Sequence, residues 1–260
     1  MRRCLITLAK SYKKQCLDYV ESVLSGKKRR VGKEVIMACA RFRDDLNRDD
    51  LELHSKEPDF VINIVEKTMV HMQGETLEGE PLKNKPLKFQ DWQIFIVYNL
   101  VGFYYKGTNE RRYKEAFIFI PRKNGKTTFI AALAFALGLL ERASGATVYI
   151  VAASMKQAFQ FILNSLRYNG MVEDFRVLDN YAEHSLTYQF EDEYGNPSGY
   201  IRIEALASNP DAQDSFNCNI AIADELHAFK KPAQYNRFKE AMQAYTNKLM
   251  IGITTAGDNV

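Results

Sequence analysis

The chain has 260 residues, of which 46% are hydrophobic and 26% charged, so it can bury a large core and is neither disordered nor fibrous. Its formal net charge of +3 permits a polyanionic partner without demanding one. The cysteines Cys4, Cys16, Cys39 and Cys218 are scattered and have no histidine at zinc spacing, which indicates free thiols in a reducing compartment. The apolar stretches are shorter than a membrane span and no secretory signal opens the chain, so we expect no membrane association.

The N-terminal third is predicted to be helical. Apolar residues recur at helical spacing over residues 5–23 and 35–46, and Pro58 begins a third helical segment. Residues 27–30, all lysine or arginine, lie between the first two segments and are predicted to form an exposed basic loop. We therefore expect an N-terminal helical lobe over residues 1–80.

A further helix is predicted to begin at Asp91, as the N-cap, and to continue to Tyr104. Gln93 follows this start, and its amide offers a donor and an acceptor that match the N6/N7 edge of adenine. Trp92 could pack on the same base. Taken alone, the segment is better explained as a helix start with a buried tryptophan.

From residue 116 onward, apolar strand-like runs alternate with helical segments, which predicts an α/β fold with a mainly parallel sheet flanked by helices. Within it, residues 186–206 surround a strong turn and are predicted to form an antiparallel hairpin. The strands are expected near residues 116–120, 147–152, 186–190, 199–206, 219–223 and 248–254, and the helices near residues 126–141, 154–168 and 232–244.

The first strand leads through a tight loop into an Ala/Leu-rich helix, and the loop ends in Gly125, Lys126 and Thr127. In this context, backbone N–H groups and the helix N-terminus cradle nucleotide phosphates, the lysine adds positive charge, and the threonine hydroxyl can ligate Mg²⁺. One position departs from the usual pattern, because Ile120 stands where the first glycine is expected. The residues predicted to bind ATP in this loop are Pro121, Arg122, Lys123, Asn124, Gly125, Lys126, Thr127 and Thr128.

Two adjacent carboxylates, Asp224 and Glu225, end the apolar run of residues 219–223. In nucleoside triphosphatases the first such residue holds Mg²⁺ and the second orients and deprotonates the attacking water. The alternative is a strand that simply ends in solvated acids. Arg122 within the loop could stabilise transition-state charge at the γ-phosphate, or could be an exposed loop charge.

Short hydroxyl residues close the last strand, where Thr254 and Thr255 precede Ala256. Such a strand end beside the acid pair can sense the γ-phosphate and pass its loss to neighbouring elements. Without further context, an ordinary turn after a strand is the better explanation.

Taken together, Trp92 and Gln93, residues 121–127, residues 223–227 and residues 254–256 resemble the ATPase domain of the large terminase subunit of tailed bacteriophages. This family packages DNA into proheads, and the resemblance covers residues 85–260. It implies a RecA-like P-loop NTPase of the additional-strand, catalytic-glutamate type over residues 81–260, in which loss of the first loop glycine is common.

The resemblance also implies residue roles, with ATP as substrate and Mg²⁺ as cofactor. It assigns Gln93 to adenine and Arg122, Lys126 and Thr127 to the phosphates and Mg²⁺. It assigns Asp224 to Mg²⁺ and Glu225 to catalysis, beside Lys126 and Arg122. The coupling motif is Thr254, Thr255 and Ala256.

The implied partners are double-stranded DNA, the small terminase subunit and the portal protein. The implied assembly is a homo-oligomeric ring on the prohead, in the cytoplasm of the infected bacterium, whereas the isolated domain should be monomeric. The nuclease domain that follows in this family is absent from the 260 residues, so nuclease activity is not expected. Arg202 and Arg237 are candidates for completing a neighbouring subunit's site.

Two other classes of protein remain open. A superfamily-2 helicase-like DNA-dependent ATPase uses the same glutamine, loop and acid pair, but needs a second RecA-like domain. A non-hydrolysing nucleic-acid-binding or assembly module would be free to lose Lys126 and Glu225, and this chain retains both.

Overall fold

The computed structural model describes residues 10–26, 31–76, 78–152, 154, 158, 164–169, 176–192, 194–207 and 217–255. They form two compact units. The helical unit comprises Arg2–Lys67 and Lys88–Lys114, and the sheet unit comprises Thr68–Leu87 and Glu115–Val260. The predicted boundary between residues 80 and 81 differs from this division, because the helix that begins at Asp91 packs with the N-terminal helices.

Aromatic packing holds the helical unit together. The Phe95 ring lies 5.3 Å from that of Tyr19 and 5.6 Å from that of Phe42, which in turn meets Phe103 edge-on at 5.0 Å. The elements of this unit are α1 (Lys13–Leu24), α2 (Lys33–Leu46), α3 (Lys56–Thr68), α4 (Asp91–Gly102) and an antiparallel pair of strands, β1 (Leu51–Leu53) and β2 (Phe103–Tyr105).

The start and end of α4 differ from the prediction. The N-cap is Gln90 rather than Asp91, because the side chains of Gln90 and Gln93 form a capping box with each other's backbone. The helix ends at Gly102, two residues before Tyr104, because the chain becomes extended there to pair with β1.

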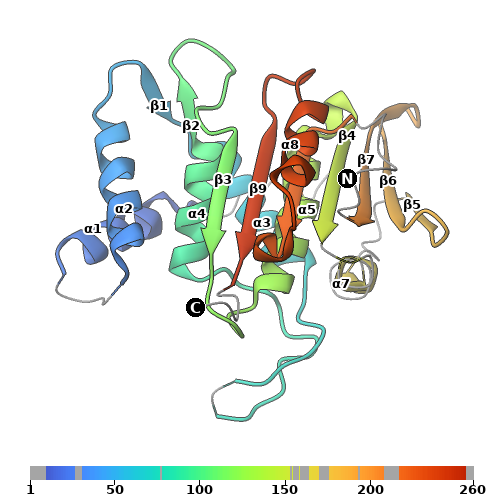
Figure 1. The fold of residues 1–260 in the computed structure, drawn as a ribbon, viewed down its shortest axis with the longest axis horizontal. Helices are drawn as coiled ribbons and strands as arrows, with labels where there is room; N and C mark the ends of the chain where they lie inside the picture. The colour runs from blue at the N-terminus through green and yellow to red at the C-terminus, as the bar shows by residue number, and fades with distance from the viewer. Residues whose placement is uncertain are drawn as a thin grey trace. The chain divides into compact units, whose positions relative to one another are not determined.

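A seven-stranded sheet forms the sheet unit, in the order β3-β9-β8-β4-β7-β6-β5 (Figure 1). The first five strands in this order are parallel, whereas β6 pairs antiparallel with β7 and β5 pairs antiparallel with β6. The predicted hairpin is confirmed as β6 and β7. The strands are β3 (Glu115–Phe119), β4 (Ala146–Ala152), β5 (Arg176–Asn180), β6 (Ser185–Glu191), β7 (Pro197–Ala207), β8 (Ile220–Asp224) and β9 (Leu249–Thr254).

Helices cover both faces of the sheet, as the prediction of a mainly parallel sheet requires (Figure 1). On one face Gly138 of α5 (Lys126–Glu141) lies against Val148 of β4, and on the other face Phe238 of α8 (Pro232–Ala241) contacts Tyr149. Shorter helical segments are η1 (Arg142–Ser144), α7 (Asn164–Asn169) and η4 (Leu226–Ala228). Of the predicted helix 154–168, the described helical part is α7, and much of the remainder lies outside the described residues.

One stretch contradicts the expectation that no apolar segment reaches the length of a membrane span. Lys126–Ser144 is long and apolar enough to cross a membrane by length and composition alone. The apolar side chains between Phe129 and Leu139 are nevertheless buried against the sheet unit's own core. The helix α5 within this stretch is therefore a buried core helix of the sheet unit.

The strand order determines which loops meet. β9 lies between β3 and β8, and all three strands run parallel. Because the carboxyl ends of parallel strands lie at one edge of a sheet, the loop after β3, the end of β9 and the acid pair after β8 come together. The loop strand and the acid-pair strand are thus separated by one strand, β9.

Candidate functional site

The loop after β3 turns sharply through two residues with left-handed backbone, Lys123 (φ 66°) and Gly125 (φ 71°). The Asn124 side chain stabilises the turn by donating to the carbonyls of Pro121 (3.2 Å) and Arg122 (3.1 Å). No heavy atom lies within 4 Å of the position that a Cβ on Gly125 would occupy. The loop is exposed at the N-terminus of a 16-residue helix, where free N–H groups and the helix dipole favour an anion.

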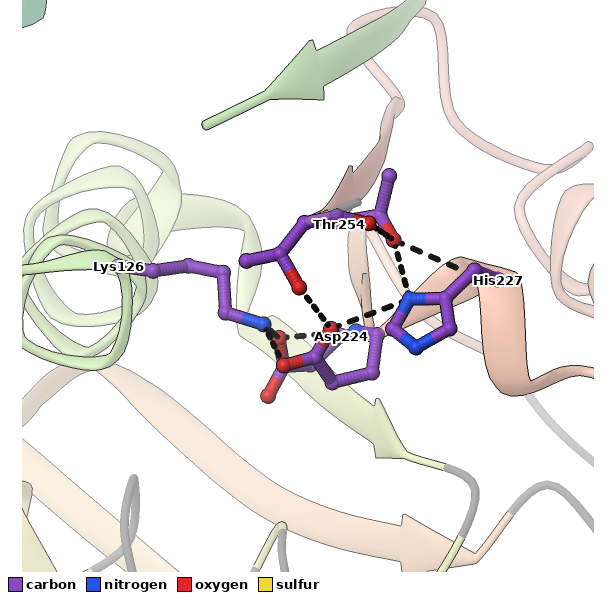
Figure 2. Close-up of polar contacts among 6 residues, drawn as sticks. Lys126, Asp224, His227 and Thr254 are labelled. Atoms are coloured by element: carbon purple, nitrogen blue, oxygen red, sulfur yellow. Dashed lines mark hydrogen bonds and ion pairs between the residues drawn. The ribbon is translucent and has the colours of Figure 1, made fainter. Parts of the chain in front are cut away.

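The side chain of Lys126, the first residue of α5, points toward Asp224 (Figure 2) and forms ion pairs with both members of the acid pair. Its Nζ lies 2.9 Å from Oδ1 of Asp224, which is only 6% exposed at the end of β8, and it forms a second ion pair with Oε1 of Glu225. Glu225 leaves the strand in the left-handed conformation, with φ 50° and ψ 51°. This backbone conformation is uncommon for a residue other than glycine and is frequent at functional sites.

The two adjacent carboxyls have pKa values displaced in opposite directions. Burial raises the pKa of Asp224, and this effect outweighs the hydrogen bond and charge of Lys126, which lower it. Burial also acts to raise the pKa of Glu225, but Lys126, His227 and Thr255 together prevail and lower it. Glu225 is therefore held as a carboxylate that accepts hydrogen bonds.

The end of β9 connects the loop strand to the acid pair. The backbone N–H of Ile120 donates to the carbonyl of Thr254 (3.0 Å), and the Thr255 hydroxyl donates to Oε2 of Glu225 (3.3 Å). Both threonines are buried. Ala256, the third residue of the predicted coupling motif, lies outside the described residues.

His227 also belongs to this site, although no role was predicted for it from the sequence. Its Nδ1 lies 2.7 Å from Oγ1 of Thr254 and 3.3 Å from Oε2 of Glu225 (Figure 2). The sequence signal for such a role was the position of His227, two residues after Glu225. No spacing rule, however, could show that a residue of β9 is its partner.

Other predicted site residues occupy different surroundings. Gln93 and Trp92 belong to the helical unit, where Gln93 Oε1 accepts the backbone N–H of Gln90 (2.8 Å) and Trp92 Nε1 donates to Gln90 Oε1 (2.7 Å). Arg122 is exposed in the loop. Arg202 forms ion pairs with Glu183 (2.8 Å) and Glu204 (3.0 Å). In the pairing of β7 with β4 it lies opposite Thr147, near the amino end of β4.

The oxygen ligands at this site suit a divalent metal ion that also binds the phosphates of a nucleotide. Among the described residues, no group of three or more His, Cys, Asp or Glu side chains is arranged to hold a metal. Mg²⁺ typically keeps several waters and binds through one or two carboxylates plus substrate phosphates. The buried Asp224 carboxylate and the Thr127 hydroxyl, in the first turn of α5, fit such a site.

A mainly parallel sheet whose strand order places β9 between the loop strand and the acid-pair strand defines a RecA-like P-loop NTPase fold. Residues 91–260 match the family described as "Terminase large subunit, ATPase domain". The chain belongs to this family.

Several solved structures are similar to the chain. The large terminase of bacteriophage HK97 shares 20% identity at a TM-score of 0.53, over 75% of this chain and 36% of its own, so the present chain spans about a third of that protein. The ATPase domain of the Thermus phage P74-26 large terminase shares 14% identity at a TM-score of 0.47, over 59% of this chain and 63% of its own. A large terminase of a thermophilic bacteriophage in complex with ADP shares 12% identity at a TM-score of 0.45, over 57% and 35%. The search of curated proteins gave no significant match.

Proposed function

We propose that the chain binds and hydrolyses ATP and that this hydrolysis powers the movement of double-stranded DNA into a viral prohead. The observation that carries the proposal is the cluster around Lys126, in which the loop lysine meets both carboxylates at the carboxyl edge of the sheet. Membership of the terminase ATPase family supports the same conclusion. If β8 simply ended in solvated acids, Asp224 would not be buried against Lys126.

In this proposal the loop residues 121–128 bind the phosphates. Lys126 supplies positive charge, and Arg122, exposed in the same loop, reaches the γ-phosphate. Thr127 and Asp224 hold Mg²⁺, which neutralises charge on the phosphates when bound. Gln93 and Trp92 are proposed to recognise adenine, and Thr254, Thr255 and Ala256 to couple the nucleotide state to movement.

Glu225 is proposed to orient the attacking water and accept its proton. Lys126 is one of the groups that lower the pKa of this carboxyl. Phosphates compete for the same ammonium group, so nucleotide binding weakens that contribution. The pKa of Glu225 then moves back toward its usual range, and its carboxylate becomes a stronger base in the nucleotide-bound site.

The wider assembly belongs to the same proposal. Partners of this chain are duplex DNA, the small terminase subunit and the portal protein, with several copies in a ring at the prohead in the host cytoplasm. Arg202 is a poor candidate for completing a neighbour's site, since two carboxylates hold it.

The test is ATP turnover by the purified chain with Mg²⁺, with and without duplex DNA. We expect measurable hydrolysis that duplex DNA stimulates. Nucleotide binding without turnover under both conditions would favour the non-hydrolysing module. Displacement of a strand from a forked duplex at the expense of ATP would favour the helicase.

A further inference from the structure

His227 has no role in the proposed function, yet it makes several contacts within the site. Its side chain extends from η4, directly after Glu225, toward the end of β9 (Figure 2). The ring Nδ1 lies 2.7 Å from Thr254 Oγ1 and 3.3 Å from Glu225 Oε2. The backbone N–H of His227 also donates to Thr254 Oγ1, at 3.3 Å. The imidazole therefore joins Glu225 to the end of β9.

The hydrogen-bond pattern assigns the proton on this ring. Thr254 has one hydroxyl hydrogen, which it donates to the carbonyl of Thr255 at 3.2 Å. Its oxygen is then an acceptor toward His227. An ionised Glu225 carboxylate can only accept. Because both neighbours of Nδ1 accept, Nδ1 carries a hydrogen and donates to them.

Glu225 needs such support, because its left-handed backbone is an unfavourable conformation for a glutamate. Its carbonyl accepts the N–H of Ala228 (2.8 Å), which fixes the backbone at the start of η4. On the carboxylate, Oε1 faces Lys126, whereas Oε2 faces His227 and Thr255. Bound phosphates compete with Oε1 for Lys126. They leave the contacts of Oε2 with His227 and Thr255 in place.

We propose that His227 is a positioning residue that fixes the carboxylate of Glu225 and couples its orientation to the end of β9 through the Thr254 hydroxyl. The Thr254 carbonyl also accepts the N–H of Ile120, just before the phosphate loop. The loop, the end of β9 and the base thus form one hydrogen-bonded chain. The inference rests on the proposed function, since positioning matters for turnover only if Glu225 acts on the attacking water.

The experiment compares His227→Ala with His227→Asn, measuring kcat and KM for ATP and the Tm of each protein. Loss of the Nδ1 donor should lower kcat on the order of ten- to a hundredfold, the scale expected for a misplaced catalytic group. KM should change little, since the contacts of His227 described above are with Thr254 and Glu225, neither of which is proposed to bind phosphate. Asparagine places an N–H near the position of Nδ1, so His227→Asn should recover most of the lost kcat.

Thr254→Val provides an independent test of the coupling. It removes the hydroxyl while keeping the shape of the side chain, and should reduce kcat as His227→Ala does. Because both changes break one hydrogen-bonded chain, the double variant should lose little more than either single variant. Full additivity of the two losses would contradict the proposed coupling.

The matched control is His184→Asn, in the turn between β5 and β6, near the other lateral edge of the sheet. Its positive φ of 51° is one that asparagine tolerates, and kcat should not change. A parental kcat in His227→Ala would overturn the inference, as would a well-folded His227→Asn with no recovery. Absence of ATP turnover in the unsubstituted chain would instead refute the proposed function.

Discussion

At the scale of single residues, the site separates two tasks between adjacent carboxylates. Asp224 is buried against Lys126, whereas Glu225 turns away from the strand and is held by partners on both oxygens. Their pKa values move in opposite directions for stated physical reasons. This division suits one carboxylate that holds a metal and one that handles a proton.

Binding and turnover should therefore respond differently to two substitutions. Glu225→Gln keeps the size of the side chain and should leave ATP affinity largely intact while reducing hydrolysis by roughly two to four powers of ten. Lys126→Ala should weaken ATP binding as well, because it removes a charge from the phosphates. Titration with a fluorescent ATP analogue and a phosphate-release assay measure the two effects. Hydrolysis by Glu225→Gln at the parental rate would refute the proposed base.

At the scale of elements, α5 must approach the sheet closely to place Lys126 at the acid pair. Gly138 permits this approach, since a Cβ there would lie 2.7 Å from Ile201 Cγ2 and 3.2 Å from Val148 Cγ2. These methyl groups are attached to Cβ atoms of buried strands and cannot move aside freely. The glycine is therefore required by helix–sheet packing rather than by its backbone conformation.

Gly138→Val should lower the free energy of unfolding by about 1–3 kcal/mol, the usual cost of overpacking a core. Urea denaturation followed by circular dichroism measures this change. The control is Ala233→Val on the exposed side of α8, which introduces the same side chain at the cost of helix propensity alone, well under about 1 kcal/mol. Equal effects of the two substitutions would contradict the packing explanation.

At the scale of the whole molecule, we predict that the isolated chain is largely monomeric and a slow ATPase. In a ring motor a positive group from the next subunit completes each site, and such a group can contribute about three to five powers of ten in rate. Light scattering combined with steady-state turnover tests this prediction. Fast turnover by a preparation shown to be monomeric would contradict a group supplied by the neighbour.

The basic segment of residues 27–30 lies outside the described residues, and its role stays a prediction. Packaging must accept any sequence, so contacts should go to DNA phosphates and carry no base preference. Replacing all four basic residues with alanine should weaken duplex binding and flatten its salt dependence, measured at two salt concentrations. An unchanged salt slope would indicate that this segment is only a solvated loop. The DNA-binding surface would then be sought in residues 154–170 and 230–248.

Much of the sheet unit could be predicted from local sequence. Six strands and the start of α5 at Lys126 were expected within about two residues, because buried parallel strands appear as short apolar runs between turn residues. The strand β5 was not predicted, since it is a mostly exposed edge strand without an apolar pattern. A division into two parts was expected, but the place of α4 in the helical unit was not, because the aromatic contacts of α4 with α1 and α2 join distant segments.

The sequence by itself determined the fold class, the phosphate loop and the acid pair, since each depends on neighbouring residues and a local change from strand to helix. Only the tertiary structure decided that β9 lies between β3 and β8 and that His227 shares a hydroxyl with Thr254. Strand order and hydrogen bonds between residues 27 positions apart arise from long-range packing. That packing brings the acid pair, His227 and the end of β9 together at one edge of the sheet.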